Sequence, residues 1–353
     1  MISLAGRVLS MLSTSSSAVN LAPCKRGIRY LEWPLRVKFM RIPEQRPATG
    51  QGPEPADAHI GYHAISGTSD AGGFPISMSY TGTMKAALPV GLLLVATIGA
   101  AQFGRGGRGV YQRRAAYATP GDFDGGFQFC RLVFRQAGNG DGAGWNVDWP
   151  RADENLSIRL SELSRVPVSL EEGQSPKPLL VRLTDPGVVC RCPFIMMTEP
   201  GGAYFDDQEA ANLRDYLLRG GFLWADDFWG EHAWDVWEDQ LRKALPSSAF
   251  PIVEVPHDHP VFHQVFPVSS FPQIPGIGYW DGRNRTSERG PSTAVPHLRA
   301  INDDRGRVMV LMTFNTDFGD SYERETEDPA YFQRFSVPGY AFGINVVVYA
   351  MTH

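Results

Sequence analysis

The sequence predicts a three-layer α/β domain with a mainly parallel β-sheet, on three observations. Short, uninterrupted apolar runs such as 194–198 recur along the chain, and such runs are typical of strands covered on both faces. Amphipathic helical patterns separate these runs. Acidic residues follow several of them directly, and in open parallel sheets ligands bind beyond the carboxyl ends of the strands. We therefore expect the functional groups in the loops that follow strands.

The first half of the domain alternates predicted strands and helices. Aromatic and β-branched residues indicate the first strand, and Asp153 precedes a helical pattern that it can cap. The helix places Leu156, Leu160 and Leu163 on one face. The predicted segments are a strand over 128–134, a helix over 154–165, and strands over 179–183 and 194–198.

The stretch from Thr198 to Leu245 has the clearest pattern. Asp206 and Glu209 have the spacing of a capping box, which predicts the start of a helix. Two glycines at 220–221 end that helix, because glycine tolerates the left-handed conformation of a C-terminal cap. The pattern then predicts a strand over 222–225 and a helix over 231–245.

The pattern loosens after Val255. Residues 271–296 are rich in proline and glycine and predict a long loop, and loops of that length tend to be functional or mobile. Regular structure returns as a hairpin-like strand pair over 297–301 and 307–314. The final segment, 339–351, has helical spacing, with a buried strand as the alternative.

Residues 84–101 predict a secretory signal peptide. Lys85 supplies the basic end, sixteen uncharged residues follow, and small residues stand at the cleavage position. The run is shorter than the about 20 residues that span a bilayer. An uncleaved N-terminal membrane anchor and a buried apolar segment are the alternatives. We thus expect 1–83 to be upstream or disordered sequence, 102–126 a flexible Gly/Arg-rich linker, and 127–353 a periplasmic or secreted domain.

Charge and cysteine content limit the class of partner. The net charge is -5 and 20% of the residues are charged, so no general basic field indicates nucleic acid. The domain contains three cysteines, an odd number, and Cys190 and Cys192 are too close in sequence for an easy mutual disulfide. We therefore expect buried free thiols at these positions and at Cys130. No cofactor is expected, and no zinc motif accompanies the cysteines.

Acidic and polar residues follow the predicted strands. Adjacent carboxylates such as Asp226 and Asp227 raise each other's pKa, which suits acid–base chemistry or a divalent cation. The structural alternative is that Asp227 caps the following helix and Asp226 bonds the backbone of a neighbouring strand. If the loops converge, they form an acidic pocket. The candidate ligand-binding residues are Glu199, Gly201, Gly202, Asp226, Asp227, His232, Asp258, Asn315 and Asp317.

The histidines give a weaker signal. His232 lies opposite the apolar stripe of its predicted helix, so it either faces solvent or leans over the strand ends. His257 and His259 flank Asp258 and could at most face one ion, but a turn or helix cap explains the segment as well. The sequence has no nucleophile elbow, P-loop or H-E-x-x-H motif, so it assigns no catalytic residue.

Four stretches carry a family resemblance: VDWPRADENL (147–156), FIMMTEPGGAYFDDQEAANLRDYLLRGGFLWADD (194–227), PHDHPVF (256–262) and FGINVVVYAMT (342–352). With them the chain resembles a bacterial family known as domain of unknown function 4159. The resemblance implies a flavodoxin-like parallel sheet, similar to that of class I glutamine amidotransferases, with the nucleophilic cysteine replaced. It also implies a location in the cell envelope, and it supplies no activity. Relatives usually carry Gly-His-Gly-Gly where this chain has Glu199-Pro200-Gly201-Gly202, so any role of that histidine is lost here.

These observations lead to two hypotheses of function. The first is an exported domain that binds a small ligand or an envelope protein without covalent catalysis, through the acidic strand-end pocket and the 271–296 loop. The alternative is an envelope hydrolase with an acidic, metal-dependent site at Asp226 and Asp227. A purely structural envelope component is the third possibility. In each case we expect no nucleic-acid partner. We expect contact with a membrane only through the 84–101 segment, if it is not cleaved.

Overall fold

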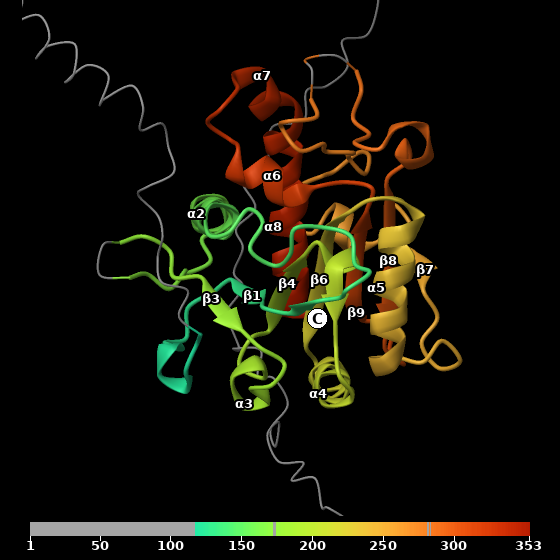
Figure 1. Ribbon diagram of the computed structural model, residues 1–353. Helices are drawn as coiled ribbons and strands as arrows, with labels where there is room; N and C mark the ends of the chain where they lie inside the picture. Colours follow the sequence, from blue (N-terminus) through green and yellow to red (C-terminus); the bar gives the residue numbers. More distant parts are fainter. Residues whose placement is uncertain (1–116, 172–173, 281, 283) are drawn as a thin grey trace, which may run out of the picture. The chain divides into compact units, whose positions relative to one another are not determined.

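A computed structural model describes residues 117–171, 174–280, 282 and 284–353 (Figure 1). The predicted upstream sequence and signal peptide lie outside the described residues, as does most of the predicted linker. Tyr117 already pairs with Leu180 in a parallel bridge, and the Ala118 backbone N–H donates to the Leu180 carbonyl at 2.8 Å. The folded part therefore extends to Tyr117, ahead of the predicted boundary at residue 127.

The centre of the fold is a seven-stranded mixed sheet, as the α/β prediction requires. Its order is β3-β1-β4-β6-β9-β8-β7, and all neighbours from β3 to β9 are parallel. Strand β8 runs antiparallel to both β9 and β7. A two-stranded antiparallel ribbon, β2–β5, lies outside this sheet. The strands are β1 Cys130–Leu132, β2 Arg135–Gln136, β3 Leu179–Val181, β4 Phe194–Thr198, β5 Ala203–Tyr204, β6 Phe222–Phe228, β7 Val253–Glu254, β8 His297–Asn302 and β9 Val308–Phe314.

Helices cover both faces of the sheet (Figure 1). Apolar residues of α3, α4 and α5 share one buried cluster with one face of the strands, and those of α2, α6, α7 and α8 share a second cluster with the other face. The helices are α2 Arg151–Ser164, α3 Pro186–Val189, α4 Asp207–Leu218, α5 Gly230–Ala244, α6 Phe318–Glu323, α7 Pro329–Tyr331 and α8 Val337–Thr352. Short turns are η1 Pro120–Asp122, η2 Pro200–Gly202, η3 Pro260–Phe262 and η4 Gly290–Thr293, and a π-helical turn, η5 Phe332–Ser336, joins α7 to α8.

The central strands are buried along their whole length. Every residue of β4, β6 and β9 is buried, which explains why these segments are continuous apolar runs in the sequence. The stretch Pro329–Thr352 is the one described helical segment long and apolar enough to span a membrane, and 72% of its most apolar window is buried in the fold. It packs as a core helix, so the predicted helix at the C-terminus is confirmed.

Two predicted helix features are wrong in detail. Asp153 lies inside α2, whose N-cap is Pro150, because its carboxylate pairs with the buried Arg131. Leu163 is 51% exposed, whereas Leu156 and Leu160 are fully buried. The predicted capping box of α4 is confirmed, since the Asp206 side chain accepts from the Glu209 backbone N–H.

The prediction of free thiols is wrong. Cys130 in β1 and Cys192 before β4 form a disulfide with a Cα–Cα distance of 6.2 Å. Their sequence separation of 62 residues hides the pairing, which arises because β1 and β4 are neighbours in the sheet. Cys190 is disulfide-bonded as well, and none of the described cysteines is free.

Candidate functional site

A cleft of about 570 Å³ opens at the carboxyl ends of the parallel strands. Residues that follow β4, β6 and β9 form part of its wall, as expected for an open parallel sheet. The 271–296 loop supplies another part, including Tyr279 and Glu288. The acidic and basic residues that line it are Asp141, Asp148, Glu199, Asp227, Glu288, Arg289, Asp317, Asp320, Glu323 and Arg324.

The sequence predicts three of these acidic residues. Glu199 follows β4, Asp227 lies near the end of β6, and Asp317 follows β9. These three strands are adjacent and parallel, so their carboxyl ends meet at one edge of the sheet. The predicted convergence of acidic strand ends is therefore present for Glu199, Asp227 and Asp317.

A strand irregularity turns Asp227 into the cleft. Strand β6 continues through both aspartates to Phe228, and its register with β9 shifts between Ala225 and Phe228. Asp227 has a φ of 58°, in the left-handed region. It is not the cap of α5, because Trp229 occupies that position, and its Oδ1 instead accepts from the Trp229 indole at 3.1 Å.

Asp226 has a structural role next to it. Its side chain is fully buried and accepts hydrogen bonds from the Thr313 hydroxyl and from the backbone N–H groups of Phe318 and Gly319, the latter two at 3.0 and 3.1 Å. Asp226 thus connects β6 to β9 and to the start of α6. Burial raises its pKa to about 7, against the opposing effect of these hydrogen bonds.

Asp148, Asp227 and Asp317 form the acidic centre of the cleft. One carboxylate oxygen from each lies within 4.8 Å of the other two, and the residues are only 7%, 8% and 5% exposed. Burial, and then the charge of neighbouring carboxylates, raises the pKa of all three well above the usual value. Asp148 Oδ2 is buried and has no hydrogen-bond partner among the described residues. We call these three residues the acidic triad.

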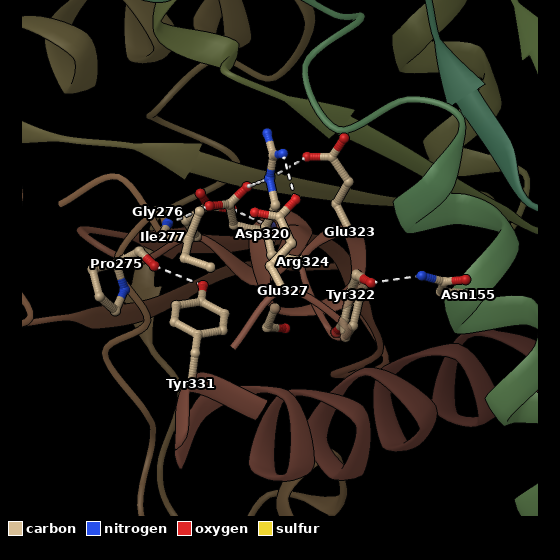
Figure 2. A network of polar contacts seen from close by, with 12 residues as sticks. Asn155, Pro275, Gly276, Ile277, Asp320, Tyr322, Glu323, Arg324, Glu327 and Tyr331 are labelled. Carbon is tan, nitrogen blue, oxygen red and sulfur yellow. Dashed lines mark hydrogen bonds and ion pairs between the residues drawn. The ribbon is translucent and has the colours of Figure 1, made fainter. Parts of the chain in front are cut away.

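A second carboxylate group adjoins the triad and carries its own counter-charge. Asp320 and Glu323 on α6 approach Asp148, but both pair with Arg324, at 3.3 and 2.7 Å (Figure 2). Asp320 Oδ2 also accepts from the backbone N–H of Ile277. Arg324 further binds Glu327 at 2.9 Å, so a single guanidinium holds this part of the wall together.

The remaining walls are held by the backbone and by one ion pair. Glu199 accepts from the Gly144 backbone N–H, and Glu288 accepts from that of Gly276 at 2.7 Å. Burial raises the pKa of both, that of Glu288 to about 7. Arg289 and Asp141 pair at the cleft, with one contact at 2.9 Å.

A fully buried arginine interacts with Asp148. Arg131 in β1 pairs with Asp153 and donates to the Thr198 hydroxyl and to the Val147 carbonyl, the last at 3.4 Å. It thereby fixes the backbone next to Asp148. Its charge favours the ionised form of Asp148, but the pKa of that carboxyl is still raised because burial outweighs it.

Besides Asp226, five predicted site residues do not line the cleft. Gly201 packs closely on Ala233 of α5, and Gly202 packs on Gln136 and Gly140, so their small size serves backbone packing. The Asn315 side chain accepts from Gly230 and donates to Val295, each at 3.0 Å. The remaining two are His232 and Asp258.

Both His232 and Asp258 are exposed. His232 Nε2 lies 2.9 Å from the Asn139 carbonyl, beside the loop that also supplies Asp141. The segment of Asp258 belongs to the opposite edge of the sheet: its neighbour His259 packs on Tyr349, whose hydroxyl accepts from Val308 at the start of β9. The prediction that Asp258 converges with the other acids is therefore wrong.

Asp148, Glu288 and Asp320 are site residues that the sequence does not single out. Asp148 lies in an irregular loop after β2, Asp320 lies inside α6, and Glu288 lies in the long loop, so none directly follows a strand of the sheet. Two signals point toward them: the VDWPRADENL stretch contains Asp148, and the predicted functional loop 271–296 contains Glu288.

Two comparisons bear on identity. A family model described as domain of unknown function (DUF4159) matches residues 129–351, which is most of the described chain. The search of curated proteins found no match.

Proposed function

The chain belongs to the DUF4159 family, and we propose that it is an exported α/β domain that binds a positively charged ligand in its acidic cleft. The single observation that carries this proposal is the charge of the lining, which contains eight carboxylates and two guanidinium groups. Both arginines already pair with carboxylates of the wall. A cationic ligand would relieve the remaining repulsion, whereas an anionic polymer such as nucleic acid would be repelled.

The proposed fold class is flavodoxin-like. Counted in chain order, the five parallel strands β1, β3, β4, β6 and β9 have the spatial order 2-1-3-4-5, which is the order of flavodoxin-like sheets. The order reverses between β1 and β4, where such sheets bind ligands. Asp226 and Asp227 stand at a strand end where an amidotransferase-like hydrolase would carry its nucleophile, which supports binding without covalent catalysis.

Export is part of the same proposal. The Cys130–Cys192 disulfide supports an oxidising compartment, and the 84–101 segment has the pattern of a signal peptide. Fractionation of expressing cells, followed by N-terminal sequencing of the mature chain, tests it. We expect the chain outside the cytoplasm with a new N-terminus near Gln102. A reduced, full-length cytoplasmic chain would contradict export.

A thermal-shift screen tests the ligand class. We expect calcium, manganese or magnesium ions, spermidine or lysine-rich peptides to raise the melting temperature at pH 7.5, because a ligand that binds only the folded state stabilises it. Matched anions such as inorganic phosphate and acidic peptides serve as the control. If no cation raises the melting temperature, or if anions raise it as much as cations do, the proposal is wrong.

A metal-assisted envelope hydrolase is the second candidate, favoured by the position of Glu288. This carboxyl lines the cleft, and burial raises its pKa to about 7, a value suited to a general base near neutral pH. Asp226 takes no direct part in the proposed hydrolysis, because it is fully buried and accepts hydrogen bonds from Thr313 and from the start of α6. Turnover of envelope saccharides or peptides that is lost in Glu288→Gln, with ligand binding retained, would favour hydrolysis over binding alone.

A further inference from the structure

The three acids of the triad come from separate elements but reach one point. Asp148 belongs to the loop before α2, Asp227 to β6, and Asp317 to the turn between β9 and α6. Their oxygens lie within 4.8 Å of one another. Oxygens that all contact one cation at about 2.1–2.5 Å are necessarily separated by less than about 5 Å. The triad therefore meets this condition for a shared ion.

An unsatisfied oxygen provides an independent reason to expect a ligand there. Asp148 is more than nine-tenths buried, lines the cleft, and leaves Oδ2 without a hydrogen bond among the described residues. A buried polar atom without a partner costs about 1–3 kcal/mol, so proteins rarely keep one without a bound group. Gly319 leaves room for this oxygen, because a Cβ at that position would clash with it.

The other two acids also keep an oxygen free. Asp227 Oδ1 accepts from Trp229 at 3.1 Å, and Asp317 Oδ1 accepts from the backbone of Asp320 at 2.7 Å. The second oxygen of each makes no hydrogen bond with the described residues. The existing bonds fix the two carboxylates in place, as hydrogen bonds commonly do for metal ligands.

The neighbouring acids are less suited to hold a cation. Asp320 and Glu323 already pair with Arg324, and Asp141 already pairs with Arg289. A metal ion there would have to displace or face a guanidinium. Glu199 and Glu288 accept from the backbone instead. Within the part of the chain that the structure describes, no member of the triad has an arginine at hydrogen-bond distance, and Asp148 leaves an oxygen without a partner.

We propose that Asp148, Asp227 and Asp317 bind one hard divalent cation, of the calcium, manganese and magnesium class, at the base of the cleft. This inference rests on the proposed cation-binding function, and it identifies the ligand that binds at the base of the cleft. The donors are all carboxylate oxygens, with no nitrogen or sulfur, which selects oxygen-preferring ions over zinc or copper. The open cleft above leaves positions on the ion for water or for a group of a second ligand.

Titration of the metal ion into the full-length protein tests the proposal. The protein is stripped with a chelator, desalted, and titrated separately with MnCl₂ and CaCl₂ by calorimetry, with electron paramagnetic resonance to count bound Mn²⁺. We expect one ion per chain. Asp148→Asn and Asp317→Asn should each weaken binding at least tenfold, since even outer-sphere partners of metal ligands contribute about 10–100-fold.

Asp141→Asn is the matched control, because it removes one carboxylate from the same cleft outside the triad. It should change affinity less than about threefold, as expected for a partly exposed carboxylate that already pairs with Arg289. Circular dichroism in the presence of chelator establishes that each variant is folded. Equal weakening by Asp141→Asn and Asp317→Asn would show diffuse attraction only, and would overturn the proposed site.

The same experiment separates this inference from the broader function. If neither metal binds but spermidine still raises the melting temperature, the metal site is wrong and cationic ligand binding stands. If neither metal nor spermidine has an effect, both fail. Gly319→Ala adds a test that keeps all three ligands: it pushes the Asp148 carboxylate from its place, so metal affinity should fall although no charge is removed.

Discussion

At the residue scale, two adjacent aspartates have different roles. Asp226 makes three hydrogen bonds that join β6, β9 and α6, whereas Asp227 lines the cleft and accepts one bond from Trp229. The sequence places both at a strand end and cannot assign their roles. The register shift in β6 decides them, because it points one side chain inward and the other toward the cleft.

Substitution separates these two roles. Asp226→Ala should lower the free energy of unfolding by about 2–4 kcal/mol, because the N–H groups of Phe318 and Gly319 lose a charged acceptor. Asp227→Asn should change it by less than about 1 kcal/mol, since the amide oxygen still accepts from Trp229. Urea unfolding of both variants measures the difference. Equal destabilisation by the two changes would contradict the assignment.

Asp148→Asn should stabilise the metal-free protein at pH 8. The change removes one buried like charge without losing a hydrogen bond, and asparagine tolerates the φ of 62° at this position. We expect a gain of about 1 kcal/mol in the free energy of unfolding, the worth of roughly one pKa unit. The gain should vanish when saturating metal is present, and a loss of stability in both conditions would contradict this view of the triad.

Stability should depend on pH through the raised carboxyl pKa values. Asp226 and Glu288 have folded-state pKa values of about 7, above the unfolded values near 4, so the folded protein binds more protons between these limits. The free energy of unfolding of the metal-free protein should therefore fall as pH rises from about 4 to about 7. The pKa of Asp122 is lowered to about 2, so this residue changes the free energy of unfolding only below about pH 4.

Urea unfolding at several pH values, in chelator, measures that dependence. Glu288→Gln should make the slope shallower, because one of the groups that takes up a proton on folding is removed. Added calcium should flatten it further if the cation replaces the protons of the acidic cleft. A metal-free stability that rises steadily from pH 4 to 7 would contradict the raised pKa values.

At the element scale, strands and helices are predictable where burial is complete. Strand β4 matches its predicted range, and β6 and β9 lie close to theirs, because both faces of these strands are covered. The capping box and the glycine stop also define α4 in the sequence. Strand β1 is shorter than predicted, and its central Arg131 is fully buried against Asp153.

Loops limit what the sequence can predict about the site. Glu199, Asp227 and Asp317 are found because parallel strands bring their ends together. Asp148 and Glu288 reach the cleft through irregular loops, and no periodicity indicates where such a loop returns. The positions of Asn315 and the two glycines reflect backbone packing, which residue type alone does not distinguish from ligand binding.

At the scale of the whole molecule, the disulfide joins β1 to the turn that precedes β4. The pair Cys130→Ala and Cys192→Ala opens a loop of 62 residues, and should lower the free energy of unfolding by about 3–5 kcal/mol. Urea unfolding without reductant measures it, with the unchanged chain as control. A loss of less than about 1 kcal/mol would show that packing of β1 against β4 alone secures this edge of the sheet.

The architecture as a whole concentrates negative charge at one edge of the sheet. The strands deliver Glu199, Asp227 and Asp317 there, and two loops add Asp148 and Glu288. Within the cleft, Arg289 and Arg324 each pair with carboxylates of the wall, and neither pairs with the triad. This imbalance is the physical basis for cation binding.

Crystals soaked in MnCl₂ and measured at the manganese absorption edge provide the most direct test. The account predicts one strong anomalous peak in contact with carboxylate oxygens of Asp148, Asp227 and Asp317. Manganese found only at surface carboxylates, with the triad free of any peak at saturating concentration, would contradict it.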